Sequence, residues 1–155
     1  MSRIVAPTKP YLGTRQIDKY GGGGFGARRT KTIAGEEVVY THKGLDFVAP
    51  PGHPIIMPAG GIIQHIGTAY LTGDMFSIHI KLDSVEGDNL LLKLLYVQPV
   101  IPVEERVERG QPLGYAQDIA AYHNAKEDMT PHVHLEAYRD GELINPATLL
   151  ELVNA

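Results

Sequence analysis

The sequence predicts an all-β, mainly antiparallel fold with one or two short helices. Short apolar runs recur along the chain, separated by turns rich in glycine and proline. Residues 76–82 alternate between apolar and polar side chains, as a half-buried strand does. A length of 155 residues suits one hydrophobic core, so we expect a single folded domain.

The first part of the chain lacks any period. We therefore expect residues 1–21 to form an extended basic arm and residues 22–155 to form the domain. Four consecutive glycines, Gly21–Gly24, stand at this boundary. They suit either a flexible hinge or a backbone that passes close to another group.

Each expected strand is a short apolar or alternating run. The strands are expected at residues 36–40, 46–49, 55–57, 62–66, 75–82, 90–97 and 132–138, with one more after the turn at 109–114.

Turns and helices complete the expected order of elements. Residues 85–89 resemble a hairpin turn, and Asp140-Gly141 is a strong hairpin signal. A helix is expected within 118–129 with Asp118 as its N-cap. A second, capped by Asn145-Pro146, is expected at about 146–153, because Pro146 suits a first helical turn.

Charge is unevenly distributed. Residues 1–31 carry seven Lys/Arg and one acid, a net charge of +6, whereas residues 32–155 carry −10. A basic arm on an acidic body suits contact with an acidic subunit or polymer; the alternative is a solvated tail. No nucleic-acid motif accompanies the charge, so we expect no nucleic-acid partner.

No targeting segment is apparent. The first ten residues lack the apolar stretch of a secretory signal, and no apolar run approaches the roughly 18 residues of a membrane span. We therefore expect no signal peptide, no membrane span and synthesis in the cytoplasm.

The chain has seven histidines and no cysteine, which excludes disulfides, thiolate metal sites and a cysteine nucleophile. Two clusters remain as metal-site candidates. His132 and His134 are two positions apart on an expected strand and so share one face. His42 and Asp46 are expected to share a face in the same way. Two histidines and a carboxylate, with a fourth position open, are typical of catalytic zinc sites. The alternative is a metal-free β domain with fortuitous histidines.

Several motifs resemble the lysostaphin-type (LytM-like) zinc metallopeptidases, which hydrolyse peptide cross-links or bridges of bacterial peptidoglycan. The resemblance covers about residues 22–150. The matching motifs are Phe25-Gly26-x-Arg28, His42-Lys-Gly-Leu-Asp46, Ala49-Pro-x-Gly52-x-Pro-Ile, Pro58-Ala-x-Gly61, Val107-x-x-Gly110-Gln-x-x-Gly114, Pro131-His-Val-His-Leu-Glu136 and Asn145-Pro146.

The resemblance implies a strongly curved antiparallel sheet with a narrow groove and a zinc ion at its floor. It implies His42, Asp46 and His134 as zinc ligands and His132 as a catalytic histidine. Tyr96 lies beside the site in the sequence, and its hydroxyl could steady a transition state.

The chain departs from this family at one position. Active members carry a second catalytic histidine in a Tyr-x-His-Leu motif, where this chain has Tyr96-Val97-Gln98-Pro99. An amide can donate a hydrogen bond but cannot act as an acid or base. The leukocyte-derived chemotaxins are similar in this region, lack the same histidine and are regarded as binding proteins.

Two functional hypotheses follow from the resemblance. The favoured one is a zinc endopeptidase acting on peptidoglycan peptides. Without a signal peptide, such a protein suits a bacteriophage or tail-like particle, docked to other subunits through residues 1–31 and virion-associated or released on lysis. The alternative is a catalytically impaired member that binds zinc and serves as a binding or structural module. The other four histidines, His53, His65, His79 and His123, are expected to lie outside the catalytic chemistry, although the loop that carries His123 could reach the groove.

Overall fold

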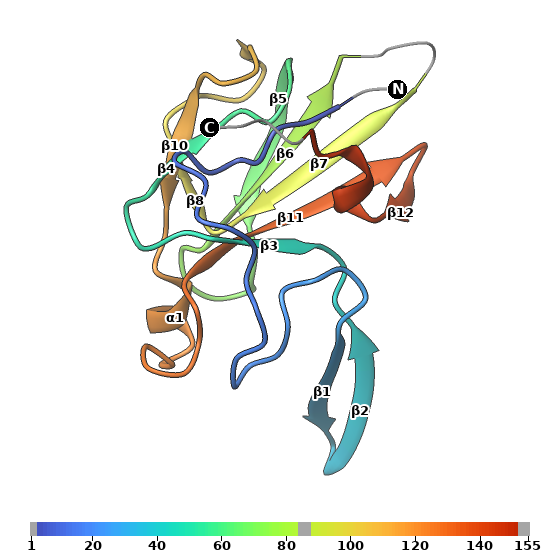
Figure 1. Cartoon of the computed structure of the whole chain (residues 1–155), viewed down its shortest axis with the longest axis vertical. Helices are drawn as coiled ribbons and strands as arrows, with labels where there is room; N and C mark the ends of the chain where they lie inside the picture. Colours follow the sequence, from blue (N-terminus) through green and yellow to red (C-terminus); the bar gives the residue numbers. More distant parts are fainter. Residues whose placement is uncertain (1–2, 84–87, 152–155) are drawn as a thin grey trace.

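A computed structural model of the chain describes residues 3–83 and 88–151 (Figure 1). The mainly antiparallel β fold is confirmed. The strands are β1 (Arg28–Ile33), β2 (Glu36–Thr41), β3 (Leu45–Val48), β4 (Pro54–Ile56), β5 (Gly61–Thr68), β6 (Phe76–Leu82), β7 (Leu90–Leu95), β8 (Val97–Pro99), β9 (Arg106–Val107), β10 (Pro112–Ala116), β11 (His132–Arg139) and β12 (Glu142–Ile144).

The largest sheet has seven strands, in the order β12-β11-β7-β6-β5-β9, with β3 also paired to β11. The N-terminal half of β11 pairs with β3 and its C-terminal half with β12, while β7 lies on its other side. A smaller sheet has the order β4-β10-β8. The β1–β2 hairpin extends away from the rest of the fold in Figure 1.

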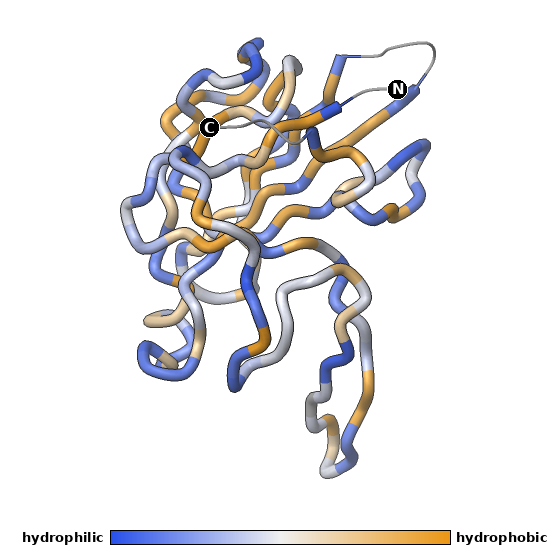
Figure 2. The backbone as a smooth tube through the Cα atoms, viewed as in Figure 1, coloured by the Kyte–Doolittle hydropathy of each residue, from blue (hydrophilic) through white to orange (hydrophobic). Residues whose placement is uncertain are grey.

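The hydrophobic core lies against one face of the large sheet. The alternation expected for 76–82 is confirmed, because Ile78, Ile80 and Leu82 are buried in this core. In β11, Val133, Leu135 and Ala137 point the same way. Figure 2 shows these apolar stretches along the strands of the sheet. The intervening side chains occupy the opposite face, and the functional cluster described below is built on that face.

Both expected helices are shorter than predicted. The first, α1 (Ile119–Tyr122), has the predicted N-cap, since the Asp118 carboxylate accepts from the N–H of Ala121. It ends early because Asn124 has a φ of 55° and the N–H of Ala125 bonds to the carbonyl of Ala120. This pattern is a Schellman C-cap.

The second is one 3₁₀ turn, η1 (Pro146–Leu149), capped by Asn145. The predicted continuation of this helix is wrong for residues 150–151, because Leu150 is extended and bridges Ile4. Residues 152–153 lie outside the described residues.

Two other differences concern strands. The strand expected at 90–97 divides at Tyr96, whose φ of 72° sends β7 and β8 into different sheets. Strand β1 was not predicted, because Arg28–Ile33 is mostly charged or polar and shows no apolar alternation. Most of the turn expected at 85–89 lies outside the described residues; the turn at Asp140-Gly141 is confirmed by positive φ angles at both positions and the β11–β12 pairing.

The N-terminal segment is extended and runs along the body. Ile4 is fully buried and bridges Leu150, and Thr14 bridges Phe47 of β3. No helix in the described part of the chain has the length and apolar character needed to cross a membrane.

Candidate metal centre

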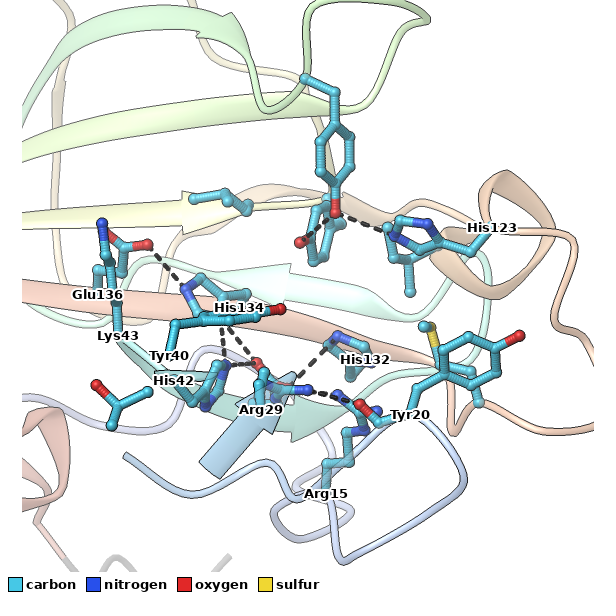
Figure 3. Close-up of a pocket in the computed structure, with 17 residues that line it drawn as sticks. Arg15, Tyr20, Arg29, Tyr40, His42, Lys43, His123, His132, His134 and Glu136 are labelled. Carbon is cyan, nitrogen blue, oxygen red and sulfur yellow. Dashed lines mark hydrogen bonds and ion pairs between the residues drawn. The ribbon is translucent and has the colours of Figure 1, made fainter. Parts of the chain in front are cut away.

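Three buried side chains, His42, Asp46 and His134, bring one potential ligand atom each to within 4.8 Å of one another. Oδ1 of Asp46 lies 2.8 Å from Nδ1 of His134 and 3.2 Å from Nε2 of His42 (Figure 3). The three residues that the resemblance implies as ligands are therefore brought together.

Strand pairing accounts for the placement of Asp46 and His134. They are direct partners in the antiparallel register of β3 and β11, and such pairs bring side chains close together. His42 precedes β3, in the connection from β2, so the expectation that it shares a strand face with Asp46 is wrong. Gly44 lets this connection pass close to β11, because a Cβ there would lie 2.8 Å from Nε2 of His134 and overlap the carbonyl of Leu135.

Hydrogen bonds from outside the centre fix the orientation of both imidazoles. Nδ1–H of His42 donates to the carbonyl of Gly24 at 2.9 Å, which leaves Nε2 facing Asp46. Nε2–H of His134 donates to the carboxylate of Glu136 at 2.9 Å, which leaves Nδ1 facing Asp46. Outer partners of this kind are typical of metal-binding histidines.

The ionisation of the cluster follows from its contacts. Burial alone would raise the pKa of Asp46, but hydrogen bonds from His134 and His42 hold that pKa well below the usual carboxyl range. Burial opposes the charged form of His134, yet bonds to Asp46 and Glu136 raise its pKa to about 9. The centre therefore holds an ionised carboxylate and attracts a cation, and a bound cation would displace the proton on Nδ1 of His134.

The donor set fits zinc. Two imidazole nitrogens and one carboxylate oxygen are borderline ligands that zinc accepts, and three protein ligands leave one position open. The fixed tautomers and the convergence of all three ligand atoms support this fit.

His132 lies on the other side of the same carboxylate. Its Nε2 is 3.5 Å from Oδ2 of Asp46, and its Nδ1–H donates to the carbonyl of Thr130 at 2.8 Å. Burial lowers the pKa of His132, which favours the neutral ring. His132 can therefore present a basic Nε2 beside the proposed ligands without being one of them.

Tyr96 covers this histidine. Its ring meets the His132 ring edge-on, with the centroids 5.7 Å apart. Burial raises the pKa of the Tyr96 phenol, so the hydroxyl remains a donor at neutral pH. The Tyr96 and Tyr70 hydroxyls are 2.8 Å apart, and the Tyr70 hydroxyl is 3.1 Å from Nε2 of His123.

These side chains line one cavity of about 410 Å³. His123 lines it too, so its loop does reach the site. Gln98 does not belong to the described lining: it is exposed on β8, opposite Tyr115. His53, His65 and His79 are also outside the lining.

Three of the cavity residues that sequence reasoning missed contact the polar groups of the site. Tyr70 lies in a connection between β5 and β6, where nothing in its neighbourhood marks it. Arg15 and Arg29 were counted among the basic residues available to an external partner. Both instead face Asp46, with guanidinium nitrogens 2.9 and 3.7 Å from Oδ2.

Comparisons with known proteins bear on the family and the fold. The model for peptidase family M23 matches residues 40–146. The chain is 26% identical over 126 residues to peptidoglycan DD-endopeptidase ShyC of Vibrio cholerae, covering 81% of this chain and 26% of that protein. It spans about a quarter of the length of the first curated relatives it matches.

Two solved structures share the fold. A zinc-containing peptidase from Vibrio cholerae superimposes with a TM-score of 0.62 at 24% identity, over 92% of this chain and 39% of that one. Lysostaphin superimposes with a TM-score of 0.56 at 18% identity, over 90% of this chain and 55% of that one. The lysostaphin-like fold class is therefore confirmed.

Proposed function

Because the chain belongs to peptidase family M23, we propose that it is a zinc-dependent endopeptidase that cleaves peptide cross-links or bridges of bacterial peptidoglycan. The observation that carries the proposal is the buried convergence of His42, Asp46 and His134 beside His132 in one cavity. The similarity to a peptidoglycan DD-endopeptidase supports the substrate class.

His42, Asp46 and His134 would hold the zinc ion. When bound, zinc supplies Lewis acidity, which polarises a scissile carbonyl and lowers the pKa of water to about 7. Glu136 and the carbonyl of Gly24 keep the two imidazoles in their ligating tautomers.

His132 is the proposed general base. Thr130 fixes its Nδ1–H, so Nε2 is free to take a proton from the attacking water and return it to the leaving amine. Tyr96 is the proposed oxyanion donor, since its phenol keeps its proton and its ring lies against His132.

We also propose a setting for this activity. The protein would act as part of a bacteriophage or tail-like particle, made in the cytoplasm and released on lysis. Exposed basic residues within 1–31, among them Lys9, Lys19 and Arg28, support docking to an acidic subunit. Co-purification with particle subunits, lost when these three residues are replaced, would test this setting.

The second candidate is a catalytically impaired member that keeps zinc and uses the groove for binding or structure. Gln98 favours it, because an amide stands where active relatives carry a histidine. Loss of one acid–base group reduces rates by about 10²–10⁴-fold. An impaired member with that loss still hydrolyses slowly, so the measured rate, and not the presence of activity alone, distinguishes the two candidates.

The test is release of muropeptide fragments from purified peptidoglycan by the zinc-loaded protein. We expect release by the wild type and a loss of about 10²–10⁴-fold in His132→Ala with zinc content unchanged. A zinc-loaded wild type that releases nothing from any peptidoglycan type would refute the endopeptidase and favour the second candidate.

A further inference from the structure

We infer that Arg15 and Asp18 are positioning residues that hold the proposed ligand Asp46 and the proposed base His132 in one network, an inference that rests on the proposed metal site. Both residues lie outside the family match, which begins at residue 40. The N-terminal segment would thus form part of the metal centre.

Arg15 joins two carboxylates. Its side chain is almost fully buried, and one nitrogen donates to Oδ2 of Asp46 at 2.9 Å. Two others, each at 2.8 Å, hold both oxygens of Asp18. Because Oδ2 of Asp46 is occupied by Arg15, Oδ1 is the oxygen left facing His42 and His134.

Asp18 connects this pair to His132. Its Oδ2 accepts from the N–H of Thr130 at 2.9 Å, and the carbonyl of Thr130 accepts from Nδ1–H of His132 at 2.8 Å. Since Nε2 of His132 lies 3.5 Å from Oδ2 of Asp46, the network closes on itself. A shift of the Arg15–Asp18 pair would therefore disturb both Asp46 and His132.

Backbone hydrogen bonds place Arg15 independently of its side chain. Its N–H donates to the carbonyl of Asp46 at 2.9 Å, and the N–H of Asp46 donates to the carbonyl of Gly23 at 2.8 Å. Backbone atoms of Arg15 and Gly23 thus bond both the carbonyl and the N–H of Asp46, the proposed ligand on β3. Because its backbone is held in this way, the Arg15 side chain loses less conformational entropy on binding the two carboxylates than it would on a mobile tail.

Two physical effects of Arg15 on zinc binding have opposite signs. As a cation beside Asp46 it repels a metal ion, whereas as a fork between two carboxylates it orients the ligand. Outer partners that orient ligands are typically worth 10–100-fold in metal affinity. Lysine keeps the charge but cannot make the fork, so Arg15→Lys separates the two effects.

The experiment measures zinc affinity by competition with a chromophoric chelator in full-length Arg15→Lys and Asp18→Asn proteins, after circular dichroism establishes folding. Asp18→Asn is isosteric and serves if the Arg15 variant does not fold. Arg28→Met, which removes an exposed cation of β1, is the control for a change of charge. We expect zinc to bind about 10–100-fold more weakly in both variants and unchanged in the control. Unchanged or tighter binding in both would overturn the inference.

A second readout follows His132 without requiring activity. In nitrogen-15 NMR spectra, the Nδ1–H of His132 should exchange slowly with water in the wild type and faster in Asp18→Asn. Equal exchange would overturn the Asp18–Thr130 part of the inference. A wild type that binds zinc but shows no hydrolysis would refute the proposed endopeptidase. The zinc affinities and the exchange rates of the variants would still decide the inference about the network.

Discussion

Nε2 of His42 lies 3.0 Å from Nδ1 of His134, although 92 positions separate the two residues. Both atoms also lie within 3.2 Å of one oxygen of Asp46. His42, His134 and Asp46 each present an acceptor atom here, and one proton cannot bridge all three. A single cation satisfies the three acceptors together.

We expect zinc to raise the melting temperature of the metal-free protein. A ligand at 100 times its dissociation constant stabilises the folded state by about 2.7 kcal/mol. The shift should vanish in His134→Ala and persist in His53→Ala, whose ring lies outside the cavity and bonds the carbonyl of Pro10. Thermal unfolding with zinc and with chelator measures it, and an equal shift in His134→Ala would refute the site.

Tyr96→Phe should slow peptide hydrolysis by about 10²–10³-fold without loss of zinc, the usual cost of removing one oxyanion donor. Tyr122→Phe is the control: its hydroxyl donates to the carbonyl of Thr72, away from the metal ligands. Steady-state rates and zinc content are the measurements. A Tyr96→Phe protein as fast as the control would exclude the hydroxyl from catalysis.

Gln98→His should leave the hydrolysis rate within about threefold of the wild type, because Gln98 is exposed and is not among the described residues that line the cavity. An added imidazole contributes as an acid or base only within hydrogen-bonding reach of the reacting atoms. A gain of about 10²-fold or more would instead support the catalytically impaired candidate, with Gln98 as its defect.

Gly23→Ala should destabilise the protein by about 2 kcal/mol, within the range for overpacked sites. A Cβ at Gly23 would lie 2.5 Å from Cβ of Arg15 and 2.6 Å from its carbonyl oxygen. Gly24→Ala is the matched control, since a Cβ there meets nothing within 4 Å. Urea unfolding compares the two, and equal stabilities would contradict the close approach.

Acid should destabilise the metal-free protein partly through Asp18. Burial would raise the pKa of Asp18, but Arg15 and the N–H of Thr130 hold it well below its usual value. A depressed pKa contributes stability that is present above about pH 4 and is lost as pH falls toward the folded-state pKa. The unfolding free energy should therefore fall less steeply below pH 4 in Asp18→Asn than in the wild type. Parallel slopes would argue against the ion pair.

Patterns local in the sequence predicted much of this molecule. Alternation fixed the faces of β6 and β11, and the spacing of His132 and His134 placed both on one side of a strand. The predicted N-caps Asp118 and Asn145 are confirmed, because a cap depends on neighbouring residues alone.

What depends on distant contacts was not predictable. The C-terminal helix is shorter than predicted because Leu150 pairs with the distant Ile4. Arg15 carries no local mark of its contact with Asp46, because the two residues lie 31 positions apart. The left-handed Tyr96 likewise breaks a run that reads as one strand.

The carbonyl of Gly24 fixes the tautomer of His42, and the carbonyl of Gly23 receives the N–H of Asp46. These contacts come from main-chain atoms that every residue type possesses. A fragment trimmed to the family match at 40–146 would keep all the ligand side chains and lose this scaffolding. A list of the ligand side chains alone would therefore overestimate how tightly such a fragment binds a metal ion.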